Sequence, residues 1–390
     1  MTITHYHFQT VSHIVSGAGS LDLLGEKLDS LGLSGLTSIF ILTQPSIVSL
    51  GYADHIKREL AKKGIASEIS TEIKPEPTEE NIEGVFHTFL KGEHDAIIGI
   101  GGGSVLDAAK ILAVLKTNDQ PISALVGTNL VEKRGVPTIL IPTTSGTGSE
   151  VTPNAIVTFP EKELKIGMVS PHLLPDLVIL DPALTLNLPK SITAATGMDA
   201  FTHALESYIS NKANPFSDMF ALESMRLISG SIQEAYHHGD HMKARENMLV
   251  GAMYGGMALT SAGTAAVHAM AYPLGGKYKV SHGVANSMLL PHVTAFNADH
   301  IIDRLEHVAR VIGLAGAHTK QDLAERVIHQ IEEWTADLHI PQQLKAFGVS
   351  KEDVPALAQA ASEVKRLMDN NPKPMSVSEI EQVYMKLLDA

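Results

Sequence analysis

The first half of the chain alternates short apolar runs with longer segments whose apolar residues recur every three or four positions. Short continuous apolar runs are typical of strands buried on both faces, and the longer periodic segments are typical of amphipathic helices. Strands that alternate with helices of this length indicate a parallel sheet covered on both faces. We expect strands at 37–43, 66–71, 95–103 and 136–144, further strands at 155–160, 165–170 and 176–182, and helices at 52–64, 78–93 and 104–118.

The pattern changes after about Pro182, where helical periodicity continues almost without a strand signal. The helical segments are 191–210, 215–238, 243–263 and 299–314. A chain of 390 residues is also too long for one ordinary hydrophobic core. We therefore expect an α/β domain over residues 1–185, with a parallel, Rossmann-like sheet, followed by an all-α domain over residues 186–390.

Composition limits the classes of partner. Hydrophobic residues make up 44% of the chain and charged residues 19%, which is typical of a globular protein. The net charge is −13 and Lys and Arg form no stripe, so we expect neither nucleic acid nor an anionic membrane as a partner. No apolar stretch approaches the roughly 20 residues that span a bilayer. The opening segment lacks the pattern of a secretory signal and the chain has no cysteine, so we expect a cytoplasmic protein.

Two glycine- and hydroxyl-rich loops follow predicted strands. In GIGGGSVLDAAK, residues 99–110, Gly101, Gly102 and Gly103 stand between a strand and a helix, where a backbone can approach a pyrophosphate at the helix N-terminus. IPTTSGTGSEVT, residues 141–152, offers Thr143, Thr144, Thr147 and Ser149. Either segment alone could be a structural turn. Together, at the carboxyl ends of strands, they favour a nucleotide site.

One carboxylate and three imidazoles form a plausible metal ligand set. Asp199 and His203 lie one helical turn apart in TGMDAFTHALESY, and His268 and His282 follow in apolar, small-residue segments. Oxygen and nitrogen donors suit Fe or Zn without a thiolate. The chain has 19 His, so chance pairs are expected, and a hydrogen-bonded helix pair is the simpler alternative. His237, His238 and His241 lie among charged and turn residues, which indicates a solvated helix end.

These segments resemble the iron-containing (group III) alcohol dehydrogenases. The resemblance rests on GIGGGSVLDAAK, IPTTSGTGSEVTPNAIVT, ATGMDAFTHALESYIS and VHAMAYPLGGKYKVSHGVANSMLLPHV, and it extends over nearly the whole chain. It implies a nucleotide-binding domain followed by a helical metal-binding domain, in the architecture shared with dehydroquinate synthase. It also implies catalysis in a cleft between the domains, and a homodimer that often assembles further.

The resemblance also assigns roles to residues. It implies that Asp199, His203, His268 and His282 bind the metal, that Gly102, Gly103 and Ser104 bind the pyrophosphate, and that Asp107 lies near the nicotinamide. Thr143, Thr144, Thr147, Thr152 and Lys165 line the expected cofactor site. The implied reaction is hydride transfer between NAD or NADP and a small alcohol or aldehyde whose oxygen is polarised by Fe(II), with Zn as an alternative.

The chain departs from the family pattern at two positions. Tyr272 stands where many members have a second His that relays protons or contacts substrate. A Tyr hydroxyl has an ordinary pKa of about 10, so it is a poorer base near neutrality, and shaping the pocket is an equal alternative. Gln44 stands where members that prefer NAD carry an acidic residue. We expect NADPH to be accepted at least alongside NADH, although no Arg is obvious as a 2′-phosphate ligand.

Three other functions are open. A lyase of the dehydroquinate-synthase type uses NAD and a metal on the same architecture, but with Glu/His/His ligands and basic residues for a phosphorylated substrate. A maleylacetate-type reductase works without a metal and lacks the full ligand set. A non-catalytic nucleotide-binding protein would not need both the loops and the ligands.

Overall fold

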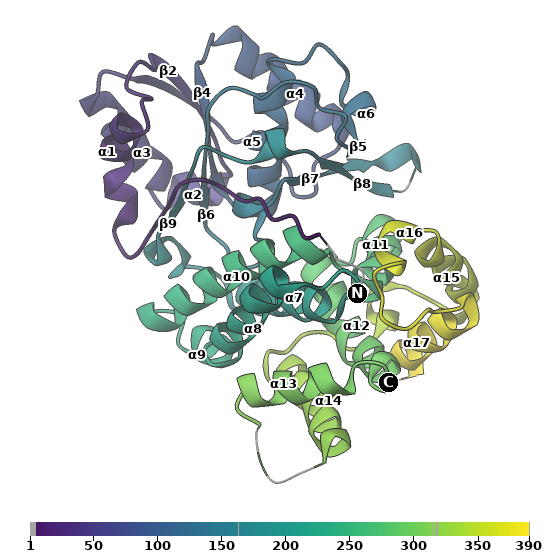
Figure 1. Cartoon of the computed structure of the whole chain (residues 1–390). Helices are drawn as coiled ribbons and strands as arrows, with labels where there is room; N and C mark the ends of the chain where they lie inside the picture. The colour runs from purple at the N-terminus through teal and green to yellow at the C-terminus, as the bar shows by residue number, and fades with distance from the viewer. Residues whose placement is uncertain (1–4, 163, 315, 317–318, 390) are drawn as a thin grey trace. The chain divides into compact units, whose positions relative to one another are not determined.

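The computed structural model describes residues 5–162, 164–314, 316 and 319–389, and the chain divides into two compact units (Figure 1). The α/β unit comprises Thr10–Thr144 and Ser149–Asn187, and the helical unit takes the remaining described residues. The main change between units falls between Asn187 and Leu188, two residues from the expected boundary. Two short segments, up to Gln9 and Ser145–Gly148, also belong to the helical unit, which a single boundary cannot represent.

The α/β unit is built on a six-stranded sheet in which every neighbouring pair is parallel. Its order is β1 (Ile14–Ser16), β9 (Leu177–Leu180), β6 (Thr138–Pro142), β4 (Ala96–Gly101), β2 (Ser38–Leu42) and β3 (Ala66–Ser70).

Two hydrophobic cores show that both faces of this sheet are covered. Ile39 and Ile41 of β2 join the core that contains residues of α1 (Leu24–Ser30) and α3 (Tyr52–Lys62). Phe40 and Leu42 join the core of α4 (Glu79–Lys91) and α5 (Gly103–Leu115). Successive side chains of a strand point to opposite faces, so the continuous apolar run of β2 supplies both cores.

Two predicted strands leave the parallel sheet. β7 (Asn154–Phe159) pairs antiparallel with β8 (Leu164–Val169), which also pairs with the short strand β5 (Gly127–Thr128). Every second residue of β7 is buried, which is the alternation of a sheet covered on one face only. The expected parallel sheet is confirmed, and two of the further strands form a second, smaller sheet whose alternating burial distinguishes it from the first.

The helical unit contains no strand within the part of the chain that the structure describes. Its longer helices are α7 (Lys190–Ile209), α8 (Pro215–Ser229), α10 (Met242–Ala262), α11 (Ala266–Tyr278), α12 (His282–Asn297), α13 (Ile302–Val311), α14 (Lys320–Asp337), α15 (Val354–Ser362) and α17 (Val377–Asp389), with short helices α9 (Ile232–His237) and α16 (Lys365–Met368). α7 packs against α8, α10 and α12 and is buried almost throughout its second half. None of the described helices is long and apolar enough to cross a bilayer.

Candidate metal centre and cofactor loops

The four predicted metal ligands come together in the helical unit. Asp199 and His203 lie on α7, His268 lies on α11, and His282 is the first residue of α12. One ligand atom from each lies within 4.8 Å of those of the others. Three segments far apart in the sequence therefore converge on one point, as the resemblance implied.

The distances are close to those that a metal requires. The Nε2 atoms of His203 and His268 are each 3.9 Å from Oδ1 of Asp199, and Nε2 of His282 is 3.8 Å from it. Ligands at about 2.1 Å in a regular tetrahedron lie about 3.4 Å apart. The three distances to Asp199 exceed that spacing by about half an ångström, and all four ligand atoms lie within 4.8 Å of one another.

Asn286, one turn after His282 on α12, shows that these acceptors face a common point. Its amide nitrogen donates to Oδ1 of Asp199 at 2.7 Å and lies 3.1 Å from Nε2 of His268 and 3.2 Å from Nε2 of His282. One amide has only two hydrogens for these three acceptors. The cluster therefore has more buried acceptors than donors, and a bound cation would satisfy the acceptors that lack a donor.

Glu206 extends the site behind His268. Its buried carboxylate accepts hydrogen bonds from Nδ1 of His268 at 2.6 Å and from the backbone N–H groups of Ala265 at 3.0 Å and Val267 at 2.6 Å. A proton held on Nδ1 leaves Nε2 as the acceptor that faces Asp199. The sequence analysis missed this residue, although Glu206 stands seven positions after Asp199, on the same face of α7.

Electrostatics favour metal-binding protonation states. Burial alone would raise the pKa of Asp199, but the three imidazoles and the Asn286 amide outweigh burial and lower that pKa. Burial lowers the pKa of His203, so its imidazole is neutral near pH 7. An ionised carboxylate and neutral imidazoles are the forms that bind metal ions.

Tyr272 lies beside this centre, as expected, on α11. The centroid of its ring is 6.2 Å from that of His282. Burial raises the pKa of the Tyr272 hydroxyl, and interaction with the Arg366 guanidinium only partly offsets this effect. A phenol with a raised pKa stays protonated near neutrality, so it is a hydrogen-bond donor and a poor general base.

In the α/β unit, the two glycine-rich loops adjoin each other at the carboxyl ends of β4 and β6. These strands are paired, with Gly101 opposite Pro142, and the backbone N–H of Thr143 donates to the carbonyl of Gly101 at 2.9 Å. Gly102 is the N-cap of α5 and makes no side-chain cap hydrogen bond. A Cβ on Gly102 would lie 3.5 Å from the side chain of Thr144. The N-terminus of α5 and the hydroxyl groups of the second loop are therefore neighbours.

Asp107 and Lys110 of α5 fasten the second loop to this helix. The carboxylate of Asp107 accepts from the hydroxyl of Ser149 and from the backbone N–H of Ile156 at 3.0 Å. The buried ammonium of Lys110 donates to the carbonyls of Ser149 at 2.8 Å, Thr152 at 3.3 Å and Asn154. Both oxygens of Asp107 are thus engaged within the protein, which indicates a positioning role in addition to any contact with a cofactor.

Glu76, which the sequence analysis missed, joins two predicted cofactor residues. Its backbone N–H donates to the hydroxyl of Ser104 at 3.0 Å, and its carboxylate pairs with Lys165 at 2.6 Å. Glu76 has a positive φ of 52°, so it adopts an unusual backbone conformation for a residue other than glycine. The loop before α4 is therefore held against both the pyrophosphate motif and β8.

The remaining predicted residues have different surroundings. Gln44 follows β2 and precedes α2 (Pro45–Ser49), and its amide donates to the hydroxyl of Ser46 at 3.1 Å. Thr147 belongs to the helical unit, whereas Thr143, Thr144 and Thr152 belong to the α/β unit. His237 is the last residue of α9 and pairs with Asp337, and His238 is the C-cap of that helix. His241 is the N-cap of α10. All three are exposed, which agrees with a solvated helix end.

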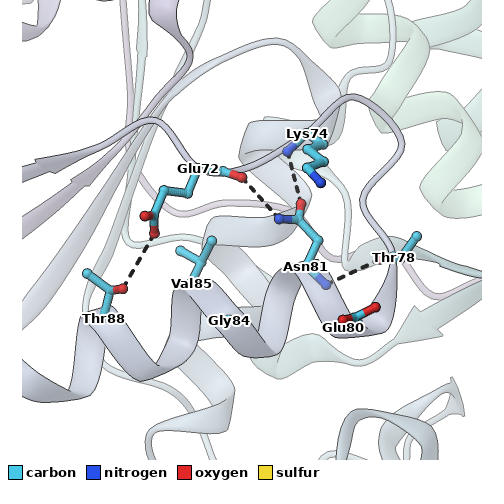
Figure 2. A pocket seen from close by; sticks show the side chains of 8 residues that line it. All are labelled: Glu72, Lys74, Thr78, Glu80, Asn81, Gly84, Val85 and Thr88. Carbon is cyan, nitrogen blue, oxygen red and sulfur yellow. Dashed lines mark hydrogen bonds between the residues drawn. The ribbon is translucent and has the colours of Figure 1, made fainter.

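A surface hollow of about 480 Å³ on the α/β unit contains none of the predicted site residues. Figure 2 shows that Asn81 of α4 bonds to the segment before this helix, which also lines the hollow. The side chain of Asn81 accepts from the backbone N–H of Lys74 and donates to the carbonyl of Glu72. The hollow therefore shares no lining residue with the candidate site.

Comparison with known proteins agrees with this geometry. A family model described as "Iron-containing alcohol dehydrogenase" matches residues 12–182, and one described as "Fe-containing alcohol dehydrogenase family, C-terminal" matches residues 193–388. The chain is 37% identical to long-chain-alcohol dehydrogenase 1 of Geobacillus thermodenitrificans (strain NG80-2), over 98% of this chain and 96% of the relative. It is 33% identical to the NAD-dependent methanol dehydrogenase of Bacillus methanolicus, over 96% and 97%. A crystal structure of 1,3-propanediol oxidoreductase superposes with a TM-score of 0.94 at 32% identity, covering 99% of this chain and 100% of the other. The chain therefore belongs to the iron-containing alcohol dehydrogenase family.

Proposed function

We propose that Asp199, His203, His268 and His282 hold a divalent iron, and that the protein interconverts a small alcohol and its aldehyde with a nicotinamide cofactor. The observation that supports this most directly is the convergence of four ligand atoms within 4.8 Å, backed by Glu206. When bound, the metal would supply Lewis acidity toward the substrate oxygen. Zn²⁺ would suit the same donors.

The residues of the chain have separate tasks in this proposal. Glu206 keeps the His268 proton on Nδ1, so that Nε2 stays available as a ligand. Asp199 supplies the single negative charge among the four donors. Tyr272 keeps its proton near neutrality and donates a hydrogen bond at the edge of the site, without acting as a base.

For the cofactor, Gly102, Gly103 and Ser104 would bind the pyrophosphate with the N-terminal amides of α5. Thr143, Thr144, Thr147, Thr152 and Lys165 would line the rest of the nucleotide site, and Asp107 would approach the nicotinamide. Gln44 carries no charge to repel a 2′-phosphate, so NADPH would serve alongside NADH. A homodimer or a larger assembly of the same chain completes the proposal, and sedimentation velocity would test it.

The first experiment follows the absorbance of NADH and NADPH at 340 nm with metal-depleted protein and propanal, before and after anaerobic addition of Fe(II). Turnover that appears only with metal would support the proposal, and the ratio of kcat/KM for the two cofactors would test Gln44. A ratio strongly in favour of NADH would refute its expected role. Absence of propanal turnover with Fe(II) or Zn(II) would point to acidic or phosphorylated substrates and to the lyase.

His268→Ala should abolish turnover and lower the bound iron measured by elemental analysis, because it removes a ligand. NADH binding, followed by fluorescence, should persist, since the predicted pyrophosphate loop with Gly102, Gly103 and Ser104 belongs to the other unit. His329→Ala changes an exposed histidine of α14 and is the matched control. Unchanged turnover and iron content in His268→Ala would refute the metal centre.

A further inference from the structure

Glu76 is a carboxylate at the predicted nucleotide site that the proposed chemistry does not use. It stands between Pro75 and Pro77 in the segment that joins β3 to α4. Its backbone N–H donates to the hydroxyl of Ser104 at 3.0 Å, and its carboxylate lies 2.6 Å from the ammonium of Lys165. All of these residues belong to the α/β unit. Glu76 therefore contacts two residues of the expected cofactor site, one with its backbone and one with its side chain.

The backbone of Glu76 adopts a conformation that its sequence disfavours. Its φ of 52° lies in the left-handed region, and a residue before proline is biased toward extended conformations. Three hydrogen bonds hold this conformation. Besides the bond to Ser104, the hydroxyl of Thr158 donates to the carbonyl of Glu76 at 3.2 Å, and the backbone N–H of Thr158 donates to the carbonyl of Pro77 at 3.0 Å. All three use the backbone of the segment, so a different side chain at position 76 would leave them in place.

The ammonium of Lys165 is paired within the protein. Lys165 lies on β8 opposite Thr158 of β7, and its side chain is 8% exposed, whereas that of Glu76 is 37% exposed. Among the residues that the structure describes, Glu76 is the only carboxylate that pairs with Lys165. An ion pair has no net charge, so the paired ammonium attracts a second anion less strongly than a free one would.

Lys165 also lies near the predicted pyrophosphate loop, because Glu76 joins the two. Ser104 is the second residue of α5, and the nitrogen and the carboxylate of one glutamate are at most about 6 Å apart. The ammonium of Lys165 is therefore within about 12 Å of the Ser104 hydroxyl, and a lysine stem is flexible. A dinucleotide with its diphosphate at Ser104 has further phosphate and ribose oxygens within that distance.

We propose that Glu76 competes with the cofactor for Lys165, and that it thereby limits the affinity of the nucleotide site. With a nucleotide bound, one ammonium is shared between the carboxylate of Glu76 and the oxygens of the cofactor. The nucleotide has to leave after each turnover, and a carboxylate that takes Lys165 back favours its release. This inference rests on the proposed function and assigns a residue that tunes its cofactor affinity.

Glu76→Gln tests the inference, because it removes the charge and keeps the size of the side chain. The Kd for NADH, measured by fluorescence titration of the iron-loaded protein without aldehyde, should fall by roughly 3- to 10-fold, which is the scale of one partly exposed ion pair. The gain should appear mainly as slower dissociation in stopped-flow fluorescence, and binding should become more sensitive to salt. A merely structural role for Glu76 would raise the Kd, so the sign of the change separates the two roles.

Two further variants keep the test independent of how glutamine is accommodated. Glu76→Asn removes the same charge and suits a positive φ better, so it should also lower the Kd. Glu80→Gln is the matched control, because it removes one negative charge from an exposed position in the first turn of α4 and should leave the Kd unchanged.

Lys165→Gln decides whether the effect of Glu76 passes through Lys165. In that background Glu76→Gln should have no effect on the Kd, since the two residues act as one pair. A Kd that is unchanged or raised in both Glu76 variants, or a gain that persists without Lys165, would overturn the inference. Absence of NADH binding in the wild type would refute the proposed function as well.

Discussion

At the scale of single residues, the candidate metal ligand His268 is held by the buried carboxylate of Glu206. Removing a carboxylate from water is unfavourable unless hydrogen bonds replace that water, and Glu206 accepts three of them. One of the three fixes the tautomer of His268. Glu206 therefore holds both the backbone at the start of α11 and the imidazole ring of His268.

Glu206→Gln should weaken Fe(II) and Zn(II) binding by roughly 10- to 100-fold, since removal of the partner behind a ligating histidine has effects of that size. The amide of Gln is uncharged and a poorer acceptor for the His268 proton. Competition with a chromophoric chelator would measure the change without relying on activity.

Ser207→Ala is the control for Glu206→Gln, because Ser207 is the next residue of α7, is buried, and bonds to the carbonyl of Gly263 away from the metal ligands. It should keep the wild-type affinity for metal. Equal affinity in Glu206→Gln and wild type would show that the tautomer of His268 is fixed without Glu206.

At the scale of elements, the site depends on how closely α12 approaches α7. Gly283 follows the ligand His282 in the first turn of α12, and a Cβ there would lie 2.3 Å from the backbone oxygen of Ala195. No side chain fits at that distance. Glycine at this position allows His282 to lie close to Asp199 and His203, the candidate ligands on α7.

Gly283→Ala should therefore force the two helices apart, lower stability by about 1–3 kcal/mol and weaken metal binding. Calorimetric melting should show a Tm lower by roughly 2–4 °C for each kcal/mol in a domain of this size. Gly84→Ala is the control, because Gly84 lies inside α4 with no atom near its absent Cβ. It should raise stability by about 0.5–1 kcal/mol, since alanine favours a helix. A wild-type Tm and metal affinity in Gly283→Ala would refute the steric argument.

At the scale of the whole molecule, a buried carboxyl makes stability depend on pH. Glu150 is 2% exposed, and burial raises its pKa from 4.5 to about 7, although its own backbone N–H and Lys110 oppose the rise. Between pH 4.5 and 7 the folded protein binds more protons at Glu150 than the unfolded chain. The stabilisation that Glu150 contributes is complete below about pH 4.5 and is lost as pH rises to about 7.

Glu150→Gln should remove this dependence, so that its stability relative to wild type rises between pH 5 and pH 8. The difference should not exceed about 3 kcal/mol, because Lys110 compensates part of the charge. Urea unfolding at several pH values would measure it. Glu83→Gln, at an exposed position of α4, should run parallel to wild type. A Glu150→Gln curve parallel to wild type would refute the proposed titration.

The sequence by itself predicted most strands of the α/β unit, the change to helical character near residue 185, and the four side chains that cluster as candidate metal ligands. Hydrophobic periodicity reports local structure directly, and the ligand segments are long and specific, so these features needed no coordinates. The tertiary structure alone decided which buried polar groups support the candidate site: Glu206 behind His268, and Asn286 between the candidate ligands. It also moved NAIVTF into a second sheet and assigned residues 145–148 to the helical unit. Each of these depends on contacts between segments distant in the chain, and neither periodicity nor spacing encodes which distant segments will meet.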